Sequence, residues 1–414
     1  MASKSLSGVA LTSAQFRGAS SSTLLLFAAA VFMARAVSLM LGPLLVELAD
    51  EFHTSIAVSG QLAAVTFITW GITAPLVGPI SDAYGRRPVL LTGLALMAVG
   101  VLGSAAAWSY SSLLAFRLIT GAAGGMLPPT IMAAVADNFA PEKRGKVVGF
   151  ITSSSWVGVA LGVPAIALLG DVGGWRLPFY ITGGLLVAVW GLLWLGLPKG
   201  QRHPDQTLAF FDRFKEIGRN AAPWYVLVAN ASMQIALIGL MTYLAAYMIE
   251  DYGWDEGRTA PALALLGVGA ITGSLAGGFV AGRVRRLDWV AAVGLAGGAA
   301  TGLLFGLQVP PWVAMALAFG ASALLSVSMP VLMTLIMELA GQSRATASGM
   351  FGTSNQLGGV LGASAGGLML SLGGFPAVGL FCLAATGLSA AVIRVKMRGS
   401  AEFRLEVSSR ENQP

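Results

Sequence analysis

The chain has 414 residues, of which 56% are hydrophobic and 11% are charged, and its mean hydropathy is +0.76. This composition excludes a soluble globular protein. Repeated apolar runs of about 20 residues, each long enough to cross about 30 Å of hydrocarbon, instead predict a helical membrane protein. The net charge of +6 does not indicate nucleic-acid binding, because the basic residues lie in the short breaks between these runs.

The apolar runs predict an all-α membrane protein with twelve transmembrane helices in two pseudo-symmetric six-helix bundles. In chain order the predicted spans are 22–46, 57–80, 88–108, 112–136, 146–169, 175–197, 222–249, 259–282, 287–307, 312–338, 346–371 and 375–394. The long polar break 198–221 is a linker that separates two halves, 22–197 and 222–394, and the tails are 1–21 and 395–414. No short apolar region with a cleavage site precedes the first span, so we expect no cleaved signal peptide.

The breaks differ in charge on the two sides of the predicted membrane. On the side of the termini they are rich in Lys and Arg, whereas the opposite loops contain Arg176 and Arg258 as their basic residues. The positive-inside rule therefore predicts a multi-pass inner-membrane protein with both termini in the cytoplasm. The acidic residues of the opposite loops are Glu47, Asp50, Glu51, Asp171, Glu250, Asp251, Asp255 and Glu256.

Glycines and arginines recur along the chain at a constant offset. The matching residues are Gly78 and Gly278, Arg86 and Arg286, Arg144 and Arg344, and Gly149, Gly158 and Gly162 with Gly349, Gly358 and Gly362. Two six-span repeats of this kind are typical of a transporter whose binding site lies between the halves. The repeat is incomplete, because Gly282 stands where Asp82 would recur.

The break at residues 77–91, VGPISDAYGRRPVLL, gathers charges between two apolar runs. Its Gly and Pro residues permit a tight reversal. Asp82 can pair with a nearby guanidinium group or accept hydrogen bonds at a helix N-terminus. The alternative is a charged turn that only orients the chain in the membrane.

The segment from Gly78 to Arg87 resembles the loop between spans 2 and 3 of the major facilitator superfamily in residue types, spacing and position. Arg117-Leu-Ile-Thr-Gly121 and the loop from Pro141 to Gly145 are also similar to that superfamily, and the resemblance covers the whole chain. It implies a latch that holds the cytoplasmic ends of the halves together in the outward-open state. The expected latch residues are Gly78, Asp82, Gly85, Arg86, Arg87, Glu142 and Arg144.

Two further segments resemble the twelve-span drug:proton antiporter efflux family. The glycine spacing of span 5 is similar to its signature, and so is the stretch from Thr242 to Gly253. Span 5 departs from the signature at Val163-Pro164 and at Ala167-Leu168. The resemblance implies export that is driven by inward proton flow.

Two arginines are predicted to lie inside the membrane, where a charged side chain costs about 2.5–3.5 kcal/mol on insertion scales. Arg35 falls near the middle of span 1 and Arg117 in the outer half of span 4. Each side chain is a candidate for binding a substrate anion. The alternative is that each donates to backbone carbonyls and tightens the first bundle.

No Asp or Glu falls in the middle of a predicted span, although proton coupling requires a protonatable group. The candidates nearest to the membrane interior are at span ends: Glu47, Asp137 and Glu338. The alternative is that each is an ordinary helix-terminal ion.

Neutral polar and aromatic residues within the spans are candidates for lining a substrate site, because polar groups at this depth face protein or a cavity instead of lipid. They are Trp156 in span 5, Asn230, Gln234 and Tyr243 in span 7, and Asn355 and Gln356 in span 11. The alternative is that they form hydrogen bonds between helices.

Nothing in the sequence indicates an enzyme, a cofactor or a metal site. There is no phosphate-binding loop for ATP, His53 and His203 lie in loops, and Cys382 is the single cysteine. We therefore expect a monomeric secondary transporter in the lipid bilayer that exports a small drug-like compound or metabolite against inward proton flow. One alternative is a transporter of an organic anion that uses Arg35 and Arg117. Another is a membrane sensor that has kept a transporter fold.

Overall fold

The computed structural model describes residues 21–139, 141–197, 221–281, 286–339 and 344–397. Within these ranges nearly every residue is helical and no strand occurs, which confirms the predicted all-α class. Eleven of the described helical segments are long and apolar enough to cross a membrane.

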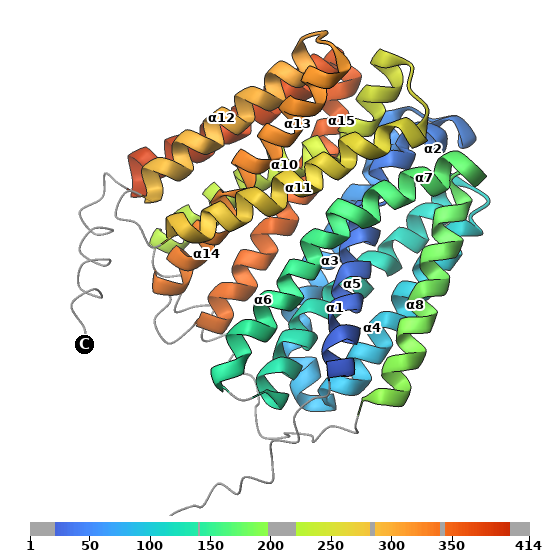
Figure 1. The fold of residues 1–414 in the computed structure, drawn as a ribbon, viewed down its shortest axis with the longest axis vertical. Helices are drawn as coiled ribbons and strands as arrows, with labels where there is room; N and C mark the ends of the chain where they lie inside the picture. Colours follow the sequence, from blue (N-terminus) through green and yellow to red (C-terminus); the bar gives the residue numbers. More distant parts are fainter. Residues whose placement is uncertain (1–20, 140, 198–220, 282–285, 340–343, 398–414) are drawn as a thin grey trace, which may run out of the picture.

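The described first part of the chain forms helices α1 to α8. Its elements are α1 (Ser21–Leu39), η1 (Gly42–Leu44), α2 (Leu45–Glu51), α3 (Ile56–Tyr84), α4 (Arg86–Ala105), α5 (Tyr110–Asn138), α6 (Pro141–Val157), η2 (Gly158–Gly162), α7 (Val163–Gly173) and α8 (Arg176–Gly196). The second part comprises α10 (Ala221–Tyr252), α11 (Glu256–Ala281), α12 (Arg286–Gly306), α13 (Pro311–Ser326), α14 (Ser328–Leu339), α15 (Arg344–Ala391) and η4 (Val392–Met397). In Figure 1, α1 to α8 gather on one side and α10 to α15 on the other.

Several predicted boundaries shift because helices continue through polar residues. The predicted span 1 ends at residue 46. In the structure the apolar segment turns at Pro43, continues into α2 and ends at Glu51. The two last predicted spans form the single element α15, whose helical backbone is interrupted at Gly373 and Gly374. Gly374 has a φ of +66°, a conformation that favours glycine.

Small residues allow helices to approach closely within each part of the chain. A Cβ on Gly158 would lie 2.7 Å from the carbonyl oxygen of Phe32 in α1. In the same way, a Cβ on Gly362 in α15 would lie 2.7 Å from the carbonyl oxygen of Ile235 in α10. Each of these glycines holds two helices of its own part of the chain together, as expected for helices that pack in lipid.

Two long seams join the two parts of the chain, beside a shorter contact of η1 with α10. In the first, α3 packs on α15, from Ala57 beside Gly367 to Gly71 beside Gln356. In the second, η2 and α7 pack on α11, from Ala160 beside Gly267 to Asp171 beside Gly257. We call the end where α2 and the last turn of α7 meet the start of α11 the closed end.

The opposite end of the molecule is less tightly packed. Four glycines near it have no heavy atom of the described structure within 4 Å of the position that a Cβ would take: Gly78, Gly149, Gly278 and Gly349. In Figure 1 the lower ends of α6 and α14 lie apart at this end. We call it the open end.

Candidate functional site

Arg35 lies near the middle of the apolar segment Ser22–Glu51 and packs beside Gly158 at the start of η2. Its guanidinium carbon is 5.7 Å from the centre of the Trp156 ring. None of the carboxylates in the described ranges forms an ion pair with it. An aromatic face stabilises a cation without accepting its N–H groups as an anion would.

Trp156 lies on the side of α6 that is nearer to the second part of the chain. It precedes Ala160 by about one helical turn, and Ala160 contacts Gly267 in α11. Trp156 is half-buried, as is Arg35. The pair therefore lies on the open-end side of the second seam.

Arg117 has a different environment, because its side chain is fully buried between α5 and α8. Its Nη2 donates to Thr120 Oγ1 over 3.1 Å, and its guanidinium carbon is 5.3 Å from the centre of the Phe179 ring. Its Nε and Nη1 have no partner in the described structure. Unpaired buried donors of a charged group cost free energy, and a substrate can reach Arg117 only after the surrounding helices move.

Three of the predicted lining residues form a hydrogen-bonded amide cluster between α10 and α15. Asn230 Nδ2 donates to Asn355 Oδ1 over 2.7 Å and to Ser354 Oγ over 2.7 Å. Gln234 Nε2 donates to the same Asn355 oxygen over 3.0 Å. Both α10 side chains are buried, so the contacts favour the interpretation that this cluster joins two helices.

The other two candidates in this part of the chain lie at the first seam. The Tyr243 hydroxyl donates to the carbonyl of Ala363, and the Tyr243 ring fits beside Gly60 of α3. Gln356 packs its Cβ and Cγ against Gly71 of α3. Both residues therefore contact the first part of the chain, so a movement between the two parts would change these contacts.

The predicted latch residue Arg86 forms an ion pair across the open end of the first part. Its Nε lies 3.0 Å from Asp137 Oδ2 at the end of α5, and its Nη1 donates to Ser81 Oγ over 2.7 Å. Asp137, a proton-coupling candidate, is thus the partner of a latch residue. Gly85 has a φ of +93° where α3 reverses into α4, which explains why this position requires glycine.

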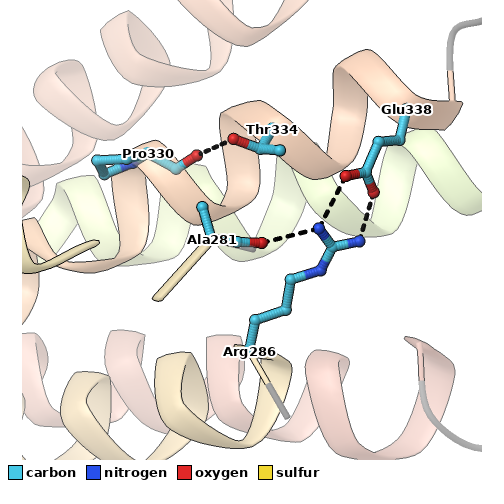
Figure 2. A network of polar contacts seen from close by, with 5 residues as sticks. All are labelled: Ala281, Arg286, Pro330, Thr334 and Glu338. Carbon is cyan, nitrogen blue, oxygen red and sulfur yellow. Dashed lines mark hydrogen bonds and ion pairs between the residues drawn. The ribbon is translucent and has the colours of Figure 1, made fainter. Parts of the chain in front are cut away.

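The second part contains a matching ion pair. Figure 2 shows that Arg286 reaches both carboxylate oxygens of Glu338 in α14, with 2.8 Å between its Nη1 and Oε1. The same Nη1 donates to the carbonyl oxygen of Ala281 over 3.0 Å. Ala281 and Ser81 occupy equivalent positions at the offset of the repeat. Glu338 therefore pairs with Arg286 as Asp137 pairs with Arg86.

The remaining latch residues are distributed differently. Arg87 donates from Nη2 to the carbonyl oxygen of Trp194 over 2.6 Å and covers the Trp194 ring. Gly78 has open space beside it. The side chains of Asp82, Glu142 and Arg144 lie outside the described part of the structure.

Glu47, the third proton-coupling candidate, lies at the closed end in α2. Its Oε1 is 3.1 Å from the position of a Cβ on Gly174, and Glu256 at the start of α11 places its Oε2 2.7 Å from the position of a Cβ on Gly170, one turn earlier in α7. Sequence reasoning missed Glu256 as a functional residue, since it was one of eight acids in the loops on that side. The sequence signal that could have identified it is that Glu47, Asp171 and Glu256 all lie at the ends of predicted spans on the same side of the membrane.

The family model of the Major Facilitator Superfamily matches residues 26–363. The chain belongs to the Major Facilitator Superfamily. Its homologues and its fold are those of transporters, which are not enzymes.

Named relatives of this superfamily transporter are found along most of its length. It is 27% identical to the uncharacterized MFS-type transporter YwfA of Bacillus subtilis (strain 168) over 390 residues, which cover 91% of this chain and 93% of the relative. It is also 27% identical to the 3-(3-hydroxy-phenyl)propionate transporter of Escherichia coli (strain K12) over 350 residues, 80% of this chain and 81% of that protein.

Solved structures confirm the superfamily fold. A bacterial homolog to the human lysosomal transporter Spinster, in an inward-facing and occupied conformation, superposes with a TM-score of 0.76 at 17% identity, covering 92% of this chain and 98% of the other. The human organic anion transporter MFSD10 (TETRAN) superposes with a TM-score of 0.65 at 19% identity, covering 90% and 98%.

Proposed function

We propose that this superfamily transporter is a secondary active transporter of a small organic anion. The observation that carries the proposal is the Arg35 guanidinium, which lies near the middle of an apolar helix, is held over the Trp156 ring, and has no carboxylate partner among the described residues. A cation at this depth is costly unless it serves a ligand or a partner. A substrate carboxylate would supply that partner, and its charge would be neutralised at the same time.

The named relatives support this substrate class. One is a 3-(3-hydroxy-phenyl)propionate transporter, and one structural neighbour is an organic anion transporter. Arg presents a planar fork of donors that fits a carboxylate in a bidentate manner. Trp156 adds a flat apolar surface beside this fork, which suits an anion that carries an aromatic or other apolar group.

We further propose that the twelve predicted spans are real and form two six-helix bundles, 22–197 and 222–394, joined by the linker 198–221. The interruption at Gly373 and Gly374 supports a division of α15 into two spans. The equivalent close contacts of Gly158 with α1 and of Gly358 with α10 support the repeat. Alternating access would then be a rocking of the two bundles about the central site.

The orientation follows from the charges. Basic residues concentrate near the open end and acidic residues at the closed end, so we place both termini and the open end in the cytoplasm and the protein in the inner membrane. A site that is loaded from the cytoplasm in this state makes export the direction that we propose.

A second candidate is export of a drug-like compound in exchange for protons. The resemblance of residues 77–91 and of Thr242 to Gly253 to efflux proteins favours it. In this version Arg35 is a structural residue, and Glu47, Asp137 or Glu338 carries the proton. The two candidates differ in the charge of the substrate and in the response to a pH gradient.

The test is transport by purified protein in proteoliposomes, with and without an imposed pH gradient. We expect aromatic carboxylates to be transported in preference to matched neutral amides and to cations of similar size. The proposal fails if cations are transported and carboxylates are not. An Arg35→Gln variant, measured beside wild type, shows whether the preference depends on this guanidinium.

A further inference from the structure

Carboxyl groups from both bundles meet at the closed end. Glu47 comes from α2 and Asp171 from α7, both in the first part of the chain, and Glu256 comes from α11 in the second. A Cβ on Gly170 would lie 2.7 Å from Glu256 Oε2, and a Cβ on Gly257 would lie 2.6 Å from Asp171 Oδ2. Glycine at these positions therefore leaves room for each carboxyl group against the opposite helix.

Arg176 and Arg258, the basic residues predicted for the loops at the closed end, are each paired within their own half. Arg176 Nη1 lies 2.8 Å from Glu51 Oε1, and its guanidinium covers the Trp175 ring. Arg258 Nε lies 3.2 Å from Asp255 Oδ2. In the described part of the chain no ion pair joins a cation to Glu47, Asp171 or Glu256.

A second observation concerns a proton that Glu47 or Glu256 could hold. Glu47 and Glu256, from the two halves, place carboxylate oxygens against Gly174 and Gly170, one helical turn apart at the end of α7. Glu47 Oε2 is enclosed by protein and has no hydrogen-bond donor in the described structure. Ionised carboxylates are acceptors only, so two of them cannot form a hydrogen bond with each other. If one carboxyl group holds a proton, its O–H can donate to the other and the contact becomes favourable.

The neighbours of Glu256 do not offset this charge. The groups that face it are Glu47 from α2, Asp171 from α7 and Asp255 from the preceding loop, and all are acidic. Asp255 is itself paired with Arg258. Closing this end therefore brings negative charges together, while opening it separates Glu256 from the two acids of the other half.

We propose that the closed end is a proton-operated gate in which Glu47 and Glu256 share one proton when the two halves meet. On opening, the proton leaves to the aqueous phase at that end, and both groups are then ionised and repel each other. On closing, a proton from the same aqueous phase binds one carboxylate, and the resulting O–H donates to the other. No covalent bond between heavy atoms forms or breaks.

This gate is distinct from proton-driven transport. The proton enters and leaves on the same side, so the gate adjusts how much of the protein opens toward that side without carrying a proton across the membrane. It rests on the alternating access of the proposed function and not on the identity of the substrate. Acidification outside the closed end should favour the closed conformation, and alkalinisation should favour opening.

The test measures the closed end directly in the full chain, without substrate. Spin labels are attached to cysteines introduced by Trp108→Cys, in the loop between α4 and α5, and Trp312→Cys, in the first turn of α13. Both positions are exposed and lie on opposite halves, while native Cys382 is buried and stays unlabelled. Distance distributions between the labels are recorded by pulsed electron resonance in lipid nanodiscs at about pH 5 and about pH 8, which span the titration of an interacting carboxyl pair. We expect the population with the longer distance to increase by roughly threefold or more on raising the pH.

The variants Glu256→Gln and Glu47→Gln should each remove this response and keep the short distance at both pH values, because an amide N–H replaces the shared proton. Asp255→Asn is the matched control, since its partner Arg258 lies in the same half, and it should respond as wild type does. A pH-independent distribution in wild type overturns the proposal. So does a wild-type response in both Gln variants. A failure of anion transport, with this pH response intact, contradicts the proposed substrate and leaves the gate in place.

Discussion

Arg86 and Arg286 occupy equivalent positions in the two repeats, and each pairs with a carboxylate at the end of a neighbouring helix. Arg86 pairs with Asp137 of α5, and Arg286 pairs with Glu338 of α14. Each arginine also donates to the last turn of the preceding helix, at Ser81 and at Ala281. The ion pairs therefore join three helices within one half, and neither crosses between the halves.

These pairs should contribute to the stability of the half in which they lie. We expect a double-mutant cycle of Arg286→Ala and Glu338→Ala, read from thermal unfolding in detergent, to give a coupling energy of about 1 kcal/mol, because Glu338 is partly exposed and solvent screens the pair. The matched cycle of Arg86→Ala with Asp137→Ala should give a similar or smaller value. Additive effects in both cycles would show that the pairs are not energetically coupled.

Arg35 should be required for transport but not for folding. We expect Arg35→Gln to reduce transport of an aromatic carboxylate by about tenfold or more, since a charge-assisted hydrogen bond to a ligand is worth about 1.5–3 kcal/mol. Arg35→Lys should retain part of the activity, because it keeps the charge and loses the planar fork. Transport and the thermal midpoint are measured on the same samples. A lowered midpoint with unchanged substrate affinity would indicate a structural residue.

Replacing Arg117 with an apolar side chain should not destabilise the protein. Its side chain is fully buried, and two of its nitrogen atoms lack partners in the described structure. We therefore expect Arg117→Met to leave the free energy of unfolding unchanged or to raise it by about 1 kcal/mol or more, as when a buried charge is replaced by an apolar side chain. Unfolding in denaturant provides the measurement. A large destabilisation would mean that the unpaired nitrogens find partners in the native protein.

Two glycines of α11 offer a matched test of the second seam. A Cβ on Gly267 would overlap the backbone of Ala160, whereas a Cβ on Gly278 would meet no described heavy atom within 4 Å. We expect Gly267→Ala to shift the labels at residues 108 and 312 toward the longer distance. Gly278→Ala should leave the distance unchanged and stabilise the helix by up to about 1 kcal/mol. Equal behaviour of the two variants would contradict the packing of this seam.

Topology fusions test the division of α15. A reporter inserted after residue 373 should report the same side as one after residue 254, because twelve spans place both on the side of the closed end. Fusions near 210 and 405 should report the cytoplasm. If the fusion after 373 reports the cytoplasm, residues 346–394 cannot form two spans.

The membrane class and most spans could be predicted from the sequence because the hydropathy of a run of about 20 residues alone decides whether it can cross a membrane. The exact ends could not, since helices such as α3 continue through polar residues once neighbouring helices provide partners. The repeat offset was visible in Arg86 and Arg286. Their carboxylate partners were named for another role, because a sequence does not show which helix ends come together.

The candidate site was predicted less completely. Arg35 and Trp156 were both named, but their contact depends on how closely α1 approaches η2, which the glycine at 158 determines. From the sequence, Asn230 and Gln234 could either line a site or join helices. The structure shows that both donate to Asn355 Oδ1 of another helix. Glu256 was missed because its significance comes from Glu47, more than two hundred residues away in the chain. Such long-range pairing leaves no pattern in one sequence.

The short π-helical segment η2 constrains how the length of this protein can vary. Gly158 and Gly162 of η2 lie against α1, while Ala160 between them lies against α11 of the other half. Deleting one residue here would rotate everything that follows by about 100°, and it would turn either Trp156 or Gly170 away from its present neighbours. We therefore expect insertions and deletions to be tolerated in the loops but not in these five residues.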